Sequence, residues 1–211
     1  MEENSRLDGV MKPEHQQLLL AIARDAIFQT LEDSTANERE WTRIKSSPVE
    51  GCPKGGVGFE VPPELMDERA TFVTLTISGH LRGCIGMLEA CRPLAEDVAA
   101  NACAAAFEDP RFEPLTKKEF EKLEIHISVL SPPEELTFSS EEDLLSQIRP
   151  GTDGLILQEG FRRGTFLPSV WEELPSKELF WAHLKRKAGL PADYWSDTLR
   201  VFRYTTEYFP S

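Results

Sequence analysis

The sequence lacks any long apolar run and any excess of positive charge. No segment approaches the apolar length of a membrane-spanning helix, and residues 1–15 are charged, without the apolar core of a secretion signal. The 23 Lys and Arg residues are outnumbered by 36 Asp and Glu residues, which gives a formal net charge of −13. Because phosphate contacts need a basic surface, this balance argues against a general nucleic-acid or anionic-membrane binder. We expect a cytoplasmic protein.

Cysteine and histidine are also sparse, with four residues of each type. The cysteines include no Cys-x-x-Cys pair, and no two histidines stand four positions apart, so the spacing typical of zinc and iron–sulfur sites is missing. We therefore predict no metal site, and free thiols rather than a disulfide framework. The sequence also has no glycine-rich phosphate loop and no Gly-x-Ser-x-Gly elbow. The cofactor stays unknown at this point.

What the sequence does contain is one short segment with a cysteine and an arginine between glycines. Residues 69–78 alternate in the manner of a half-buried strand, and Ser78-Gly79-His80 predicts a hairpin turn. If residues 81–86 return as the second strand, one face carries Arg82, Cys84 and Gly86 and the other carries Leu81, Gly83 and Ile85. A cation stabilises a thiolate, and glycine lets a ligand approach the backbone. Cys84 and Arg82 are thus candidate catalytic residues, and the other four are candidate binding residues.

A reactive Cys84 would need a base as well as a cation. The available bases are His80 at the turn and His126 on a strand predicted at 123–130, and we include His126 among the candidate catalytic residues. Each has a simpler interpretation, since His80 could be solvated and His126 could be a core histidine. Cysteine is also among the most buried residue types, so Cys84 could be a small packed side chain.

A second motif, Asp109-Pro110-Arg111-Phe112, follows the predicted helix at 94–107. Pro110 stops that helix, and Asp109 is placed to bond nearby backbone or an arginine such as Arg82. Arg111 could clamp this corner or line the same site as Arg82, and two arginines together would favour an anionic small ligand. A structural corner is the simpler interpretation, but we keep Asp109 and Arg111 as candidate binding residues.

The remaining patterns describe the organisation of the chain. Further helices are predicted at 14–32, 140–148 and 176–188, a short one begins at the capping box of Thr116 and Glu119, and further strands are predicted at 154–158 and 199–208. Residues 33–69 are rich in glycine and proline and predict an irregular connection, which could be mobile, folded over the sheet, or a flap over the site. We divide the chain into a tail, 1–13, and one domain, 14–211.

The two halves of this domain share glycine, arginine and proline residues at corresponding positions. Aligning them places Gly79, Arg82, Gly83 and Pro110 on Gly160, Arg163, Gly164 and Pro191. This predicts internal repeats at roughly 70–130 and 151–209, each with a strand, a Gly-x-x-Arg-Gly hairpin, a second strand and a helix. The second copy has Thr165 in place of Cys84, so the thiol is a feature of the first copy alone.

The segment Leu81-Arg82-Gly83-Cys84-Ile85-Gly86, with Asp109-Pro110-Arg111-Phe112 and Phe166-Leu167-Pro168, resembles the motifs of the AMMECR1 domain family, in the same order and over nearly the whole chain. The resemblance implies an α+β domain with one barrel-like antiparallel sheet and flanking helices, built from two duplicated β-β-β-α-α repeats that form two lobes. It supplies no established activity. Prokaryotic members tend to be encoded with a Memo-like protein and a radical-SAM protein, which are the implied partners.

Two hypotheses follow. In the first, the chain is an enzyme, or the accessory subunit of one, that uses Cys84 and Arg82 on a small anionic substrate. In the second, it is a non-catalytic adaptor for a protein partner, because no complete catalytic constellation is visible. Replacing Cys84 with serine would abolish activity under the first hypothesis and preserve partner binding under the second.

Overall fold

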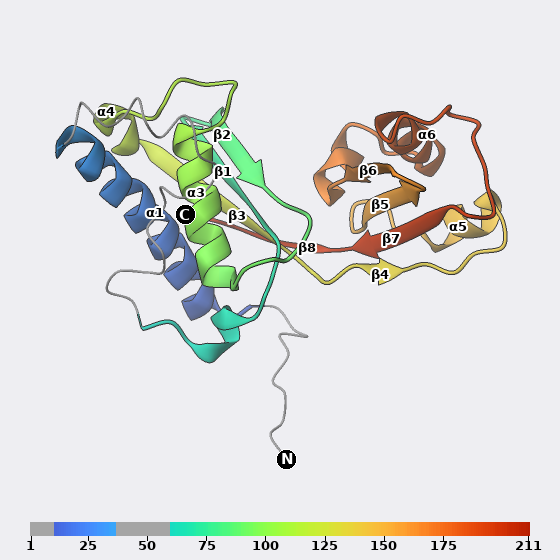
Figure 1. Cartoon of the computed structure of the whole chain (residues 1–211), viewed down its shortest axis with the longest axis horizontal. Coiled ribbons are helices and arrows are strands. Elements are labelled where there is room, and N and C mark those ends of the chain that lie inside the picture. Colours follow the sequence, from blue (N-terminus) through green and yellow to red (C-terminus); the bar gives the residue numbers. More distant parts are fainter. Residues whose placement is uncertain (1–10, 37–59) are drawn as a thin grey trace, which may run out of the picture. The chain divides into compact units, whose positions relative to one another are not determined.

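A computed structural model describes residues 11–36 and 60–211. These residues form two compact units (Figure 1): the first contains the described residues up to Val129 together with Glu207–Ser211, and the second is Leu130–Thr206. The chain therefore leaves the first unit once and returns to it. Both units combine helices with antiparallel strands, so the expected α+β class is confirmed. None of the described helices has the length and apolarity to cross a membrane.

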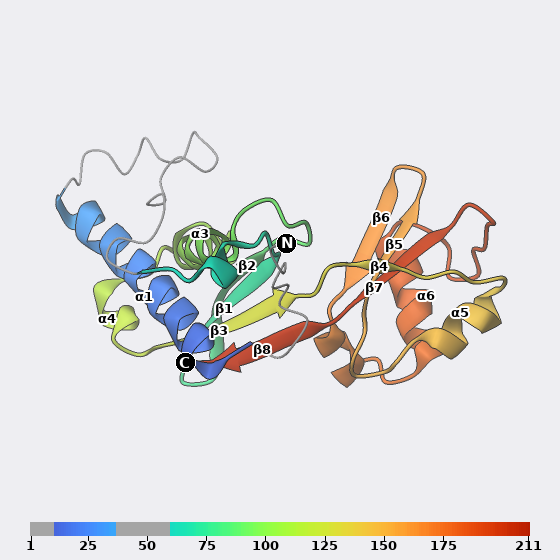
Figure 2. The same ribbon diagram turned by 90° about the horizontal axis from the view of Figure 1, so that it is seen from below.

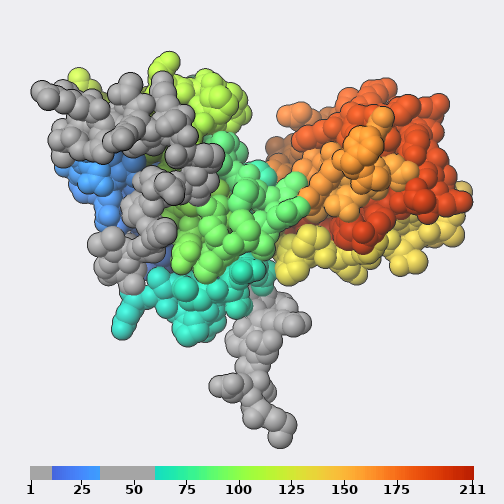
Figure 3. Space-filling view, in the orientation of Figure 1, coloured from blue at the N-terminus to red at the C-terminus, as the bar shows by residue number. Residues whose placement is uncertain are grey.

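The first unit is a four-stranded sheet covered on one face by two helices. Its elements are α1 (Pro13–Ala36), η1 (Pro63–Met66), β1 (Thr71–Ile77), β2 (His80–Gly86), α3 (Leu94–Phe107), α4 (Lys117–Phe120), β3 (Leu123–Leu130) and β8 (Thr206–Pro210). The strand order is β2-β1-β3-β8. Helices α1 and α3 lie together on the same side of this sheet (Figures 1 and 2), and Figure 3 shows the surface of the unit from the same direction as Figure 1.

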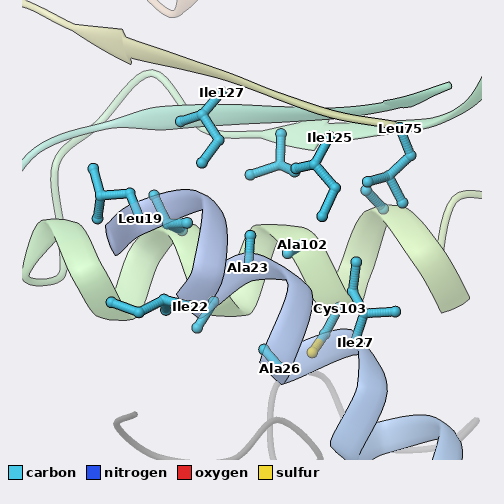
Figure 4. Close-up of a cluster of buried hydrophobic side chains, with 14 of the residues drawn as sticks. Leu19, Ile22, Ala23, Ala26, Ile27, Leu75, Ala102, Cys103, Ile125 and Ile127 are labelled. Carbon is cyan, nitrogen blue, oxygen red and sulfur yellow. The ribbon is translucent and has the colours of Figure 1, made fainter. Parts of the chain in front are cut away.

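Small side chains let these two helices approach each other and the sheet. Ala23 on α1 and Ala102 on α3 are fully buried, with Leu19, Ile27 and Cys103 around them (Figure 4). Alanine adds little side-chain bulk, so two backbones can come close and still bury the larger neighbours against the sheet. The predicted alanine-rich, closely packed helix is confirmed.

The alternation of β1 decides what each face of the sheet carries. Val73 and Leu75 are fully buried toward the helices, whereas Thr74 and Thr76 point to the opposite face and are half-buried. The two-residue turn that leads into β2, Ser78 and Gly79, has φ values of 52° and 75°, as a type I′ hairpin turn requires. The predicted hairpin is confirmed, and it leaves one polar sheet face free of α1 and α3.

A buried polar cluster fixes the start of β1 to α3. Asp97 accepts hydrogen bonds from the backbone N–H of Thr71 at 3.0 Å and from its hydroxyl at 2.6 Å. Asn101, one turn further along the helix, donates to the same carboxylate at 2.9 Å and to the Thr71 carbonyl at 3.2 Å. Because every one of these groups is buried and bonded, the cluster sets the position of β1 against the helix.

The second unit has its own sheet and core. Its elements are β4 (Glu134–Glu135), α5 (Glu141–Gln147), β5 (Gly154–Glu159), β6 (Arg162–Phe166), η2 (Pro168–Glu172), α6 (Lys177–Lys187) and β7 (Arg200–Tyr204), with the strand order β4-β7-β5-β6. Trp171 stacks on Phe180 with ring centroids 3.8 Å apart. The Tyr204 ring fills the space beside Gly154, and burial raises the pKa of Tyr204 to about 12. A separate hydrophobic core therefore supports this sheet.

Part of the expected architecture is wrong. The structure has two sheets instead of one, and the described residues form no closed barrel. The predicted β-β-β-α-α repeat is not supported, because the chain orders are β1-β2-α3-α4-β3 and β5-β6-η2-α6-β7. The strand expected at 199–208 is two strands separated at Thr205, and these belong to different sheets. An alternating pattern gives the period of a strand but does not name its partner, so it cannot distinguish one sheet from two.

The other boundaries agree more closely. The capping box of Thr116 and Glu119 is present, and Ser140 and Ser176 cap α5 and α6 as expected. Helix α1 continues past its expected end to Ala36. The irregular connection expected at 33–69 lies mostly outside the described residues, as does most of the tail expected at 1–13, so its proposed covering of the site stays a prediction.

Candidate functional site

Cys84 lies on the sheet face that α1 and α3 leave free. In the β1–β2 pairing it stands opposite Thr74, whose hydroxyl donates a hydrogen bond to the Cys84 sulfur at 3.2 Å. Thr74 in turn stands opposite His126 on β3. The three side chains therefore form one row across three strands, and the thiol at its end is half-buried. A thiol that accepts a hydrogen bond is oriented, and its negative form is stabilised.

His126 completes the row but does not bond to the thiol. Its two ring nitrogens meet Thr76 Oγ1 at 3.0 Å and Tyr208 Oη at 2.7 Å, and its ring stacks on Tyr208. Two strand spacings separate Cys84 from His126, about 10 Å between backbones. Among the described residues no hydrogen bond joins the two side chains. The structure thus brings His126 to the same face as Cys84 without forming a direct Cys–His pair.

Arg82 is placed elsewhere than a regular strand would place it. The β1–β2 register shifts between Leu75 and Thr76, and Arg82 has no partner residue on β1, as in a β-bulge. Its guanidinium bonds Glu119 at 2.9 Å and the Glu113 carbonyl at 2.8 Å. The bonds from Arg82 lower the pKa of Glu119 to about 2. No hydrogen bond joins Arg82 to Cys84 among the described residues, so the Cys84–Arg82 pair stays a prediction, and one donor of Arg82, Nη1, is buried without a hydrogen-bond partner.

Asp109 and Arg111 cover the outer edge of β2 at the cysteine. Asp109 accepts from the Cys84 N–H at 2.9 Å, and Arg111 Nη2 lies 3.3 Å from the Cys84 carbonyl oxygen, to which it donates. Arg111 also donates two hydrogen bonds to the Asp109 carboxylate, from Nε to Oδ1 at 2.9 Å and from Nη2 to Oδ2 at 2.6 Å. These bonds from Arg111, and then the bond from Cys84, hold the pKa of Asp109 well below its usual range. The same pairing raises the pKa of Arg111. The two side chains give Cys84 the bonds that a neighbouring strand would give.

The guanidinium groups of Arg82 and Arg111 both lie over the ring of Phe112, at 5.7 and 5.5 Å from its centroid. The two arginines therefore meet at one aromatic ring, a point that the sequence left open. Each is paired with a carboxylate, so the arrangement braces the corner as well as supplying charge.

The glycines of the motif are filled by the protein itself. A Cβ on Gly83 would stand 2.0 Å from the Ala105 carbonyl oxygen, and one on Gly86 would stand 2.5 Å from the Phe72 ring. Their lack of a side chain serves packing and leaves no opening for a ligand at these two positions. Ile85 packs against the core, while Leu81 is exposed, so neither of these candidate binding residues lies in the row of Cys84.

Metal and disulfide chemistry have no visible basis in this part of the chain. The described residues contain no group of three or more His, Cys, Asp or Glu side chains arranged to hold a metal ion. Cys84, Cys91 and Cys103 are free thiols, of which Cys91 is exposed and Cys103 is buried. Cys52 lies outside the described residues.

Comparison with known proteins gives the family. The family model described as AMMECR1 matches residues 20–209. This chain belongs to the AMMECR1 family. A protein of Methanothermobacter thermautotrophicus is 38% identical over 177 residues, which cover 81% of this chain and 92% of that protein. A protein of Thermofilum pendens is 36% identical over 203 residues, which cover 95% of this chain and 92% of the relative.

A solved structure shows the same AMMECR1 fold. The crystal structure of the uncharacterized protein PH0010 from Pyrococcus horikoshii is 33% identical, with a TM-score of 0.75 over 95% of this chain and 93% of that one. The resemblance noted from the cysteine motif is therefore confirmed at the level of family and fold. The relatives' names give no activity to carry over to this AMMECR1 chain.

Three residues of this AMMECR1 site carry no motif in the sequence. Thr74 and Thr76 had a visible signal, because they alternate with the core residues of β1 and so lie on the other face of that strand. Tyr208 had none, since it belongs to a strand whose sheet could not be assigned from its pattern. Its contact with His126 depends on the pairing of β8 with β3.

Proposed function

We propose that this AMMECR1 protein is an enzyme, or the accessory subunit of one, that holds or modifies a small anionic substrate at the sheet face of Cys84 and His126. The observation that carries the proposal is the hydrogen bond from Thr74 to a half-buried thiol on a face that the helices of the first unit leave free. An oriented thiol with a donor beside it is prepared to act as a nucleophile or to bind a ligand covalently.

The surroundings supply further groups for such a substrate. His126 lies in the same row and offers an imidazole. Arg82 is held by Glu119, and its Nη1 is a buried donor without a partner, which a water or ligand oxygen would satisfy. The three described free thiols fit a reducing compartment, so we place the protein in the cytoplasm.

Alkylation of individual thiols at pH 7, followed by mass spectrometry, tests this proposal. We expect Cys84 in the folded protein to react faster than Cys91, although Cys91 is the more exposed, because the hydrogen bond from Thr74 holds the Cys84 sulfur in a fixed orientation on the free sheet face. Replacing Thr74 with valine should slow the reaction of Cys84 by about three- to tenfold, the worth of one ordinary net hydrogen bond, and leave Cys91 unchanged.

Two controls accompany this measurement. Thr76→Val changes the neighbouring threonine of the same strand face and should not slow Cys84, and Cys84→Ser identifies the modified peptide. If Cys84 is alkylated only after the protein unfolds, it is a packing residue, and the proposal is wrong.

A second candidate function, an adaptor for a protein partner, is favoured by one residue of the second unit. Phe161 is 96% exposed at the tip of the β5–β6 hairpin, beside Arg162 (Figure 2 shows the hairpin). Aromatic and arginine side chains supply most hot spots of protein interfaces. The partners implied by the family resemblance are a Memo-like or a radical-SAM protein.

Calorimetric titration with these two proteins from the same organism tests the adaptor. Phe161→Ser should weaken binding at least about tenfold, because an aromatic anchor is lost. Leu179→Ser, a change of another exposed apolar residue in the same unit, serves as the matched control and should leave affinity unchanged, as should Cys84→Ser. Equal affinities for the Phe161 variant and the unchanged protein would exclude the hairpin tip as the contact.

A further inference from the structure

A second line of hydrogen bonds crosses the free sheet face beside Cys84. Thr76 and Glu124 are opposite each other on β1 and β3, and Thr76 Oγ1 lies 3.0 Å from Glu124 Oε2. The same hydroxyl lies 3.0 Å from His126 Nε2, and His126 Nδ1 lies 2.7 Å from Tyr208 Oη. Four side chains on three adjacent strands are thus linked in sequence: Glu124, Thr76, His126 and Tyr208.

The chemistry of the first member sets the direction of every bond in the line. An ionised carboxylate only accepts, so Thr76 must donate its one hydroxyl proton to Glu124. Toward His126 the threonine oxygen can then only accept, which requires the ring proton to be on Nε2. In the neutral ring Nδ1 is therefore the acceptor, and the hydroxyl of Tyr208 donates a hydrogen bond to it.

We propose that Glu124 and Thr76 fix His126 in the Nε2–H form, so that the Tyr208 hydroxyl donates a hydrogen bond to Nδ1 of the ring and presents its oxygen as a hydrogen-bond acceptor to a ligand on this face. Tyr208 is 58% exposed, so a ligand can reach this end of the line; Glu124, at the other end, is exposed as well. A ligand would have to meet that oxygen with an N–H or O–H group. The inference rests on the proposed function for the place of the ligand, and it adds a donor group to the anionic substrate proposed there.

Protonation of His126 reverses the last bond. With a proton on both nitrogens the ring donates to Tyr208, and the tyrosine hydroxyl proton becomes available to an acceptor on the ligand. The groups that face His126 are Glu124 on its own strand, Tyr208 on β8, the neutral Thr74 and Thr76 on β1, and Cys84 beyond Thr74. Glu124 is the one carboxylate in this set, and it acts on the ring through Thr76. His126, Thr76 and Glu124 are therefore positioning residues for Tyr208.

Nitrogen-15 NMR of histidine-labelled full-length protein tests the proposal without any ligand, at a pH where the ring is neutral. The chemical shifts distinguish a protonated from an unprotonated ring nitrogen, and we expect the proton of His126 on Nε2. Free histidine shares this preference, so variants decide the matter. Glu124→Ala frees the Thr76 hydroxyl to donate to Nε2, and the ratio of Nε2–H to Nδ1–H should fall about fivefold, the worth of one net hydrogen bond.

Two valine variants of β1 complete the test. Thr76→Val removes the acceptor of the Nε2–H and should move the ratio in the same direction as Glu124→Ala. Thr74→Val, which replaces the threonine that bonds Cys84 instead of His126, should leave the ratio unchanged. A proton on Nδ1 in the unchanged protein, or a ratio insensitive to both Glu124 and Thr76, would overturn the proposal. Because the readout is the histidine ring, it can fail or succeed independently of Cys84 alkylation, which tests the proposed function.

Discussion

Replacing Gly83 with alanine should destabilise the first unit by about 3 kcal/mol or more, a large part of the roughly 5–15 kcal/mol that stabilises an ordinary folded protein. The added Cβ would stand 2.0 Å from the carbonyl oxygen of Ala105 and 3.0 Å from its carbonyl carbon. Both atoms belong to the backbone of α3, so no flexible side chain can move aside. The helix would have to leave the sheet, although α3 is also fixed to β1 by the Asp97 cluster.

Urea unfolding followed by circular dichroism measures this effect, and the same hairpin offers a control. Gly79 has φ of 75°, and a Cβ added there would meet nothing within 4 Å, so Gly79→Ala brings backbone strain without a clash. Strain of that kind costs about 1–2 kcal/mol. Equal losses for the two variants would mean that α3 does not lie against β2 as described.

Replacing Asp109 with asparagine should lower the free energy of unfolding at pH 7 by about 2–4 kcal/mol, as expected when a buried charged partner is removed from its network. The carboxylate is 4% exposed and accepts from both the Cys84 N–H and Arg111. The asparagine amide has one acceptor oxygen, so its NH₂ group would face either the Cys84 N–H or Arg111, both of which are donors. Glu119→Gln is the matched control on Arg82, and since Glu119 is 35% exposed the loss there should be about 1 kcal/mol or less.

The pH dependence gives Asp109 a signature. Its pKa is lowered in the folded protein, so its contribution to stability is complete above the ordinary carboxyl value of 3.8 and is lost as the pH falls from there toward the folded value. The stability gap between the unchanged protein and Asp109→Asn should therefore be constant from neutral pH to about 5 and close below it. A gap that stays constant to pH 3 would show that the Asp109 charge is not what stabilises the corner.

Local features were predictable from the sequence where one short segment determines them. The turn at Ser78 and Gly79 needs positive φ at both positions, and the box of Thr116 and Glu119 closes within four residues. Strand partners were not predictable in this way. The sequence predicts one strand through 199–208, although the residues before and after Thr205 pair in different sheets, because the composition of a strand does not identify its neighbour.

The candidate site shows the same division. That Thr74 lies on the face opposite Val73 and Leu75 follows from the period of two. That Cys84 lies opposite Thr74 does not follow, because a regular register counted from the turn would place Cys84 opposite Val73, and the bulge shifts it by one residue. That Arg82 turns toward Glu119 does not follow, because a bulge is a property of the pairing between two strands. Tyr208 was missed for a third reason, since its partner His126 is 82 residues away in the sequence.

This separation bears on the order in which the protein folds. Joining residues 82 positions apart is entropically unfavourable and slow for an open chain. The second unit shortens the search, because the N–H of Ser131 donates to the Thr205 carbonyl at 2.9 Å and the Ser131 hydroxyl accepts from the Thr205 N–H at 2.9 Å. Once that unit has folded, the segments leading out of β3 and into β8 are held together. We therefore expect the second unit to fold first and to bring β8, and with it Tyr208, close to β3. The other strands of that sheet are nearer to each other in the chain and need no such help.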